Sequence, residues 1–154
     1  MLYAGNGTAV ALVASNMNNF YSAITTVGGT STIILVVDDN EDVASLYALF
    51  FRKLGYLVHT AFSGNLALDF IKKEPVDVLI SDLNMLEMDG FALAKAITAD
   101  GWRPNIRRIA VTAQPLDEVE KQARASGFEA IFEKPAKMSE LVKWIELNCG
   151  ICSG

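Results

Sequence analysis

The sequence predicts an α/β domain built on a mainly parallel sheet, and three observations support this fold class. Five short β-rich runs alternate with segments of helical periodicity, and two of the runs are apolar almost throughout. Of the 154 residues, 51% are hydrophobic and 20% are charged, which suits one compact folded domain. Because strands that alternate with helices form βαβ units, we expect a parallel sheet with helices on its faces.

The β-rich runs differ in composition along the chain. The first, TIILVV at 32–37, and the third, VDVLIS at 76–81, have the continuous apolar character of central strands covered on both faces. The second, YLVHT at 56–60, mixes polar and apolar residues and suits an edge. RRIAVT at 107–112 and EAIFE at 129–133 complete the predicted sheet.

The segments between the runs are predicted helices. Three of them carry an apolar stripe that we expect to face the sheet: Val43, Leu46, Leu49 and Phe50 within 41–55; Leu66, Phe70 and Ile71 within 64–73; and Phe91, Ala94 and Ile97 within 90–98. Gly55 and Gly127 stand where helix C-caps are expected. In the last helix Ser139 is the expected N-cap, and Leu141, Ile145 and Trp144 are expected to point inward.

The predicted core domain covers residues 32–147, which leaves an extension at 1–31 and a tail at 148–154. In the extension, six apolar residues follow a coiled-coil spacing: Val10, Val13, Met17, Phe20, Ile24 and Val27. They predict an extra helix that packs on the domain or pairs with a second copy as a homodimer. The stretch VGGTST at 27–32 instead suggests a flexible joint, so both interpretations stay open.

Charge and cysteine content exclude several classes of protein. The net charge of −5 disfavours direct binding to nucleic acid or to an anionic membrane. The run TAVALVAS at 8–15 lacks the positive flank of a signal peptide, so we expect a cytoplasmic protein. Cys149 and Cys152 follow a helix rather than begin one, and with the single His59 far away they are expected to be ordinary thiols.

Polar side chains follow four of the predicted strands. Asp38 and Asp39 follow the first, Asp82 the third, Thr112 closes the fourth, and Lys134 follows the fifth. Ligands of an open parallel sheet bind at the carboxyl ends of its strands, so these groups are expected to converge. Each group also has a purely structural interpretation: the acid pair can cap the next helix, Thr112 favours a strand, and Lys134 is a residue type that is usually exposed to solvent.

Together, these groups suit phosphoryl transfer. Carboxylates a few ångströms apart repel one another unless a cation joins them, and Mg²⁺ prefers oxygen ligands. Asp82 stands alone after a central strand and is the expected nucleophile, while Asp38 and Asp39 are expected to hold the metal. Lys134 and Thr112 would then contact the phosphoryl oxygens.

The motifs VVDDNED, SDLNMLEMDG, VTA and EKP resemble, in order and spacing, those of the receiver domain of two-component response regulators. The resemblance covers about residues 33 to 147. It implies a flavodoxin-like, doubly wound, five-stranded parallel sheet of order 2-1-3-4-5. It also implies that Asp82 is the phosphoacceptor, that Thr112 is the switch hydroxyl and that Pro135 follows a cis peptide bond. Asp38, Asp39, Asp82 and the backbone carbonyl of Asn84 would bind Mg²⁺.

Two positions depart from the family pattern. Leu86 stands where the family usually has proline, and Ile131 stands where it more often has an aromatic ring that swings inward during switching. The aromatic half of the switch is therefore in question, whereas phosphorylation is not. Asn84 and Gln114 flank the expected path of the water that removes the phosphoryl group.

The resemblance implies a signalling protein that catalyses its own aspartyl phosphorylation and dephosphorylation, standing alone or excised from a larger regulator or hybrid kinase. The phosphodonor would be a histidine kinase or a histidine phosphotransfer protein, and a downstream protein would bind the face of the fourth helix, fifth strand and fifth helix. Two alternatives remain: a receiver-like docking module that is not phosphorylated, and a phosphatase of the haloacid dehalogenase type. In that phosphatase class the nucleophile ends the first strand, which reverses the order found here.

Overall fold

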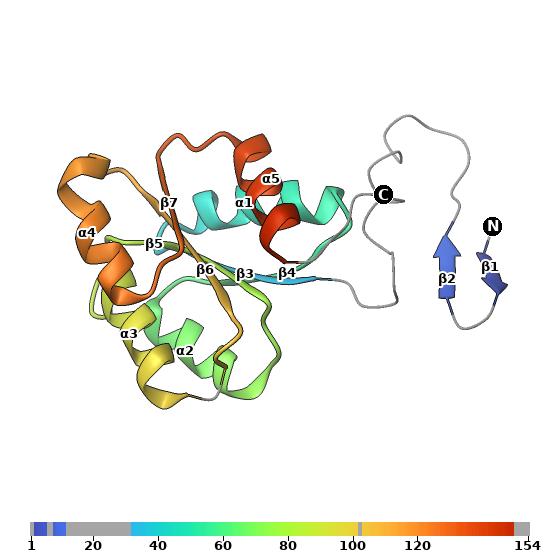
Figure 1. The fold of residues 1–154 in the computed structure, drawn as a ribbon, viewed down its shortest axis with the longest axis horizontal. Helices are drawn as coiled ribbons and strands as arrows, with labels where there is room; N and C mark the ends of the chain where they lie inside the picture. Colours follow the sequence, from blue (N-terminus) through green and yellow to red (C-terminus); the bar gives the residue numbers. More distant parts are fainter. Residues whose placement is uncertain (1, 6–7, 12–31, 102, 150–154) are drawn as a thin grey trace.

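The computed structural model describes residues 2–5, 8–11, 32–101 and 103–149. Its main sheet has five parallel strands in the order β4-β3-β5-β6-β7 (Figure 1). The strands are β3 (Ile33–Val37), β4 (Leu57–Ala61), β5 (Val78–Asp82), β6 (Arg107–Thr112) and β7 (Ala130–Glu133). Counted along this sheet in chain order, the arrangement is 2-1-3-4-5, which confirms the predicted fold class.

Helices cover both faces of the sheet (Figure 1). They are α1 (Glu41–Lys53), α2 (Gly64–Lys73), α3 (Gly90–Asp100), α4 (Leu116–Ser126) and α5 (Met138–Asn148). Helices α1 and α5 share one hydrophobic cluster, whereas α2 and α3 belong to a second cluster and α3 and α4 to a third. No helix in the described part of the chain is long and apolar enough to cross a membrane.

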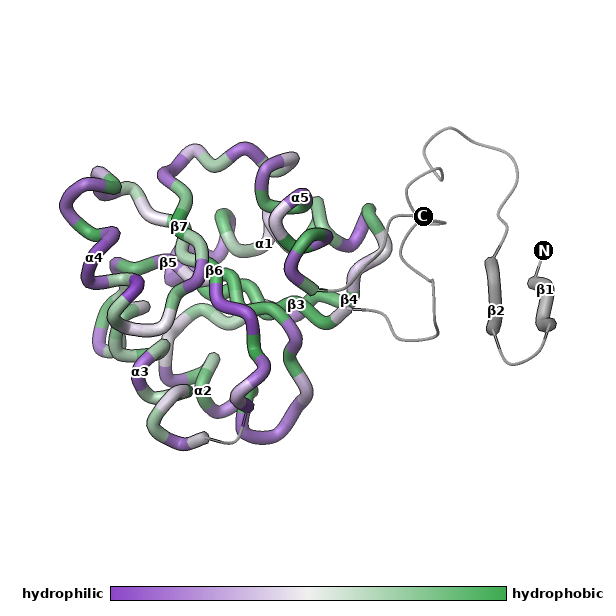
Figure 2. Tube along the Cα trace, in the orientation of Figure 1, coloured by the Kyte–Doolittle hydropathy of each residue, from purple (hydrophilic) through white to green (hydrophobic). Residues whose placement is uncertain are grey.

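The central strand β3 supplies both faces of the core because its side chains alternate. Ile34 and Val36 join the cluster beneath α1 and α5, while Leu35 and Val37 join the cluster beneath α2 and α3. In Figure 2 the interior strands are mostly green and α4 is mostly purple, as expected for strands covered twice and a helix covered once. Strand β4 lies at the edge, as its mixed composition predicted.

The predicted stripe of α1 is wrong. Leu46 and Leu49 are 61% and 51% exposed, and the buried face is formed instead by Ala44, Tyr47, Ala48 and Phe51. Two alanines on that face let the helix approach the sheet closely, and two aromatic rings fill the flanking space. Val43 and Phe50 are partly buried at the border of the stripe.

Two other details of helix placement also differ from the prediction. Leu66 is 56% exposed, because the adjacent Ala67 takes the core position of the first turn of α2. Ser139 lies within the first turn of α5, and the residue at the N-cap is Lys137, which makes no side-chain cap. The stripe of α3 and the inward positions of Leu141 and Ile145 are confirmed, while Trp144 is partly buried.

The edge strand β4 is covered at one point by α1. The Arg52 side chain donates through Nη2 and Nε to the Val58 carbonyl, at 2.8 Å and 3.2 Å. The amide of Leu57 donates to the Thr32 carbonyl, and the Ala61 carbonyl accepts from the Asp38 amide. The backbone groups of alternate residues of β4 therefore point toward β3, and those of Val58 point away from it. Arg52 therefore provides hydrogen-bond donors to a carbonyl that no strand of this sheet pairs with.

Near the N-terminus, β1 (Leu2–Gly5) and β2 (Thr8–Ala11) pair antiparallel. Val10, the first residue of the predicted apolar seam, lies in β2, and the other seam residues lie outside the described part of the chain. The division into an extension, a core domain and a tail stays a prediction. In the tail Cys149 follows α5 as its C-cap, and burial raises the pKa of its thiol; Cys152 lies outside the described residues.

Candidate functional site

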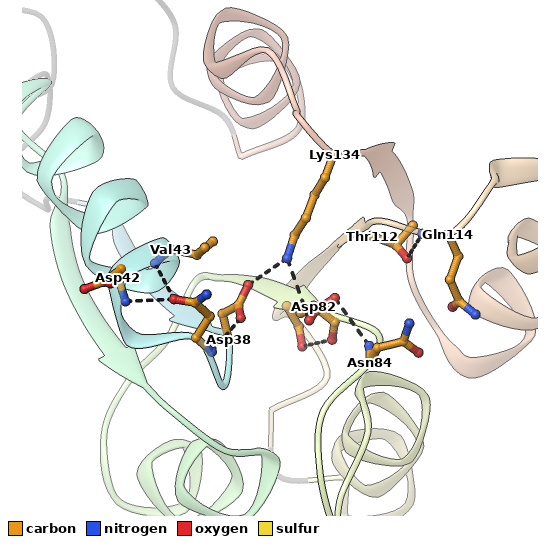
Figure 3. A network of polar contacts seen from close by, with 10 residues as sticks. Asp38, Asp42, Val43, Asp82, Asn84, Thr112, Gln114 and Lys134 are labelled. Atoms are coloured by element: carbon orange, nitrogen blue, oxygen red, sulfur yellow. Dashed lines mark hydrogen bonds and ion pairs between the residues drawn. The ribbon is translucent and has the colours of Figure 1, made fainter.

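The predicted site residues meet at the carboxyl edge of the sheet (Figure 3). Asp38 and Asp39 follow β3, Asp82 ends the adjacent β5, and Lys134 follows β7. One carboxylate oxygen from each of Asp38, Asp39 and Asp82 lies within 4.8 Å of the others. Asp38 and Asp82 are 4% and 9% exposed, whereas Asp39 is exposed.

Local hydrogen bonds orient the Asp38 carboxylate. The Asn40 backbone N–H donates to Asp38 Oδ1 at 2.9 Å, and Lys134 Nζ donates to Oδ2 at 2.8 Å. The side chain of Asn40 itself caps α1 by accepting from the amides of Asp42 and Val43. Asn40 therefore caps α1 with its side chain and orients the Asp38 carboxylate with its backbone N–H.

Lys134 lies between two carboxylates (Figure 3). Its Nζ is 2.8 Å from Asp38 Oδ2 and 3.7 Å from Asp82 Oδ2. Burial alone would lower the pKa of this ammonium, but the hydrogen bond that it donates to Asp38 and the charges of Asp82 and Asp38 outweigh burial and raise the pKa. Lys134 is followed by Pro135 through a cis peptide bond, as the resemblance implied.

The Asp82 carboxylate is buried, and nearby groups offset part of the cost of burying its charge. Burial raises its pKa, the Lys134 ammonium opposes that rise, and the Asp38 charge adds to it. The Asn84 backbone N–H donates to Asp82 Oδ1 at 3.3 Å, which favours the ionised form. Asp82 thus combines restricted solvent access with an immediate cation, as expected of a buried nucleophile.

Thr112 ends β6, the strand next to β5, and is fully buried. Its Oγ1 accepts from the Gln114 backbone N–H at 3.0 Å. The hydroxyl proton is therefore available to a further acceptor at the edge of the sheet. Ile131, in the position of the expected aromatic ring, packs against the cluster beneath α3 and α4.

The α3 helix begins directly against the Asp82 loop. A Cβ on Gly90 would collide with the Asp82 carbonyl oxygen and lie 2.9 Å from Leu83 Cα. The Gly90 amide also donates to the Leu83 carbonyl at 3.0 Å. Glycine at this position lets the backbone that carries Asp82 lie close to the helix.

Sequence reasoning missed Tyr47. This residue lies on the buried face of α1, and burial raises the pKa of its hydroxyl. The charges of Lys134, Asp38 and Asp82 also act on it, so its ring lies beneath the polar site. The leucine-based stripe predicted for α1 lies on another face of the helix. The spacing of Tyr47 and Phe51, four residues apart, is a sequence signal for the buried face.

Three acidic groups and one lysine make a site suited to a hard divalent cation and to an incoming phosphoryl group. The donor set consists of carboxylate oxygens, which is the chemistry that Mg²⁺ prefers. Asn84, the fourth predicted ligand, lies on the loop beside Asp82 (Figure 3). His59 lies on β4 away from these groups, with its ring centroid 4.8 Å from that of Phe70.

Comparison with known proteins agrees with this geometry. Residues 34–146 match the response regulator receiver domain. An uncharacterized 14.6 kDa protein of Leptolyngbya boryana is 33% identical over 116 residues, which cover 75% of this chain and 88% of that protein. The sensor histidine kinase RcsC of Escherichia coli is 34% identical over 115 residues, which are 75% of this chain and 12% of the kinase.

Solved structures give the same result. The chemotaxis response regulator CheY4 of Vibrio cholerae has a TM-score of 0.71 and 29% identity, over 77% of this chain and 98% of that one. The receiver domain of Ssk1, solved with the histidine phosphotransfer protein Ypd1 of Saccharomyces cerevisiae, has a TM-score of 0.73 at 21% identity, over 80% of this chain and 92% of that one. At that identity the second likeness concerns the fold. The chain belongs to the response regulator receiver domain family of two-component systems.

Proposed function

We propose that this chain accepts a phosphoryl group on the Asp82 carboxylate, with Mg²⁺ held by Asp38, Asp39, Asp82 and the backbone carbonyl of Asn84. The observation that carries the proposal is the meeting of Asp38, Asp39 and Asp82 within 4.8 Å, with Lys134 Nζ 3.7 Å from Asp82. When bound, Mg²⁺ would neutralise charge on the carboxylates and on the phosphoryl oxygens.

The protein's own residues account for the other parts of the transfer. An Asp82 oxygen forms a bond to phosphorus as the bond from phosphorus to the donor's imidazole nitrogen breaks, and the electron pair of that bond returns to the imidazole. Lys134, which is hydrogen-bonded to Asp38 in the unphosphorylated protein, is within reach of the phosphoryl oxygens and offsets their charge. Thr112 donates its free hydroxyl proton to one of them.

Asn84 and Gln114 flank this position and are proposed to set how long the phosphoryl group survives. Asn84 lies on the loop beside Asp82, and Gln114 is joined to Thr112 through its backbone. Their side chains are proposed to admit or to exclude the water that attacks the phosphoryl group. The protein is best described as a signalling protein that catalyses its own phosphorylation and dephosphorylation.

The proposed phosphodonor is a histidine kinase or a histidine phosphotransfer protein in the cytoplasm. Support comes from a relative that is itself a sensor histidine kinase. The proposed output surface consists of α4, β7 and α5, residues 116–147, through which a downstream protein or a second copy would bind. Phosphorylation would act by shifting an existing equilibrium at that surface.

The test is the intact mass after incubation with acetyl phosphate and Mg²⁺. We expect the wild type to gain the mass of one phosphoryl group, and we expect the gain to need Mg²⁺ and to vanish in Asp82→Asn. Asp69→Asn, which changes an exposed carboxylate on α2, is the matched control and should behave as the wild type. Asp39→Asn should raise the Mg²⁺ concentration needed for the same gain.

Other outcomes would identify the alternatives. No mass gain with acetyl phosphate or with a phosphorylated phosphotransfer protein would contradict the proposal and support a docking module. Repeated turnover of a phosphate monoester would support a phosphatase instead.

A further inference from the structure

Arg108 places a charged group inside the domain. It is the second residue of β6 and is 7% exposed. Its Nη1 donates to the Ala94 carbonyl at 3.2 Å and to Thr98 Oγ1 at 2.5 Å, both on α3. Within residues 32–101 and 103–149 no ion pair joins it to a carboxylate. A buried cation of this kind needs another source of compensation.

That compensation comes from the nearby charge of Glu129 and from the ends of two helices. Thr98 lies in the last turn of α3, and Gly127 is the C-cap of α4. A Cβ at Gly127 would lie 2.5 Å from Arg108 Nη1, so the guanidinium rests directly against that backbone. Helix C-termini carry partial negative charge, which stabilises a cation placed there. Arg108 therefore ties the C-terminal end of α4 to the C-terminal end of α3.

The other end of α4 is held differently. Its N-cap, Pro115, makes no side-chain hydrogen bond, and the first three residues of the helix are not among its buried residues, which are Val119, Ala123 and Ser126. The preceding Gln114 is joined to the site through its N–H to Thr112 Oγ1. In addition, Gln114 Oε1 is buried without a hydrogen-bond partner. A buried acceptor without a partner is unfavourable, so a rearrangement that gives it a hydrogen bond is favoured.

We propose that Arg108 is the fixed point of the switch: it anchors the C-terminal end of α4, so that phosphorylation pivots the helix about Gly127. The pivot rests on the proposed function, because its trigger is the Thr112 hydroxyl turning to a phosphoryl group on Asp82. The 11 residues of α4 then act as a lever roughly 16 Å long, with the largest displacement at its N-terminal turn. The output surface changes most near Leu116 and least near Gly127.

The test is amide hydrogen exchange of the full chain, followed in the segments 113–121 and 122–129. Beryllofluoride with Mg²⁺ serves as the phosphoryl mimic. In the unloaded protein, Arg108→Met should raise exchange in 122–129 by about tenfold and leave 113–121 near the wild-type rate, because it removes hydrogen bonds from a charged donor. Loading the wild type should alter exchange in 113–121 and keep 122–129 within about twofold, whereas loading Arg108→Met should alter both.

Lys95→Met is the matched control, because it removes an exposed cation from α3 outside both segments and should leave the pattern unchanged. Thr98→Val removes one acceptor of Arg108 at little change in volume, and it gives the same comparison if Arg108→Met does not fold. Unchanged exchange in 122–129 in these variants, or an equal response of both segments on loading, would overturn the proposal. If the wild type does not take up beryllofluoride, the proposed function fails, while the unloaded comparison still decides whether Arg108 anchors the helix.

Discussion

At the scale of single residues, burial of the ionised Asp82 carboxylate reduces the stability of the folded state. Its folded-state pKa is raised above 3.8, chiefly by burial. Below pH 3.8 the carboxyl is protonated in both states and has no effect. As pH rises from there, the unfolded carboxyl ionises first, so the free energy of unfolding falls until the pH exceeds the folded-state pKa. Above that point the loss is constant.

Asp82→Asn should therefore stabilise the Mg²⁺-free protein at pH 7, on the order of 1 kcal/mol. The gain should shrink toward zero as pH falls to the ordinary pKa of the carboxyl. Urea unfolding between pH 3 and 8 measures it, with Asp69→Asn as the exposed control. A gain that is equal at all pH values, or a loss at pH 7, would show that ionisation of Asp82 is not the cause.

At the residue scale, the sequence predicted that the polar side chains at the strand ends meet, but it did not predict the burial of Arg108 and Tyr47. Asp38, Asp82, Thr112 and Lys134 were found because each directly follows or closes a strand, and the ends of parallel strands meet in space. Arg108 is one of two adjacent arginines in RRIAVT, and a charged side chain is normally exposed. Its burial depends on the ends of α3 and α4, which are remote in sequence.

At the scale of elements, the packing of α3 against the Asp82 loop gives a second prediction. Gly90→Ala places a methyl group against backbone that cannot move aside, so it should cost about 1–3 kcal/mol and slow phosphorylation of Asp82. Gly101→Ala, at the other end of α3, has φ +65 and open space around it, so it should cost about 1–2 kcal/mol through strain alone. Denaturant unfolding and the rate of mass gain separate the two effects.

The expected contrast lies in the rate. Gly101→Ala should be phosphorylated as fast as the wild type, whereas Gly90→Ala should be slower even where it is fully folded. Equal rates for the two variants would mean that the contact at Gly90 does not position Asp82.

Within residues 32–149 the type and order of the elements were predictable from the sequence, but the buried face of α1 was not. Leucine spacing assigned the core side to Leu46 and Leu49, yet the helix turns Ala44, Tyr47, Ala48 and Phe51 inward. A helix that packs close to a sheet needs small residues at the contact and large rings beside them. This requirement concerns side-chain shape, which the spacing of hydrophobic residues does not reveal. In α3, where large and small apolar residues share one stripe, the prediction was confirmed.

At the scale of the whole molecule, the three hydrophobic clusters and the site all lie within the described residues 33–149. We therefore expect a chain of residues 32–149 to fold, with a midpoint of thermal unfolding within about 5 °C of the full chain. It should also gain one phosphoryl group with Mg²⁺ and acetyl phosphate. Calorimetry and intact mass measure these two properties.

An insoluble or inactive shortened chain would place part of residues 1–31 within the folded domain. A shortened chain that is phosphorylated faster than the full one would mean that this extension restricts access to Asp82. The full chain measured beside it is the control for both outcomes.

The bond from Arg52 to the Val58 carbonyl has a consequence for crowded conditions. An edge strand offers its outward carbonyls and amides to any extended peptide, including one from a misfolded neighbour. The guanidinium occupies the Val58 carbonyl near the start of β4, so an added strand would have to displace two hydrogen bonds before forming its own there. We therefore expect this hydrogen bond to disfavour self-association of the chain by strand addition at β4.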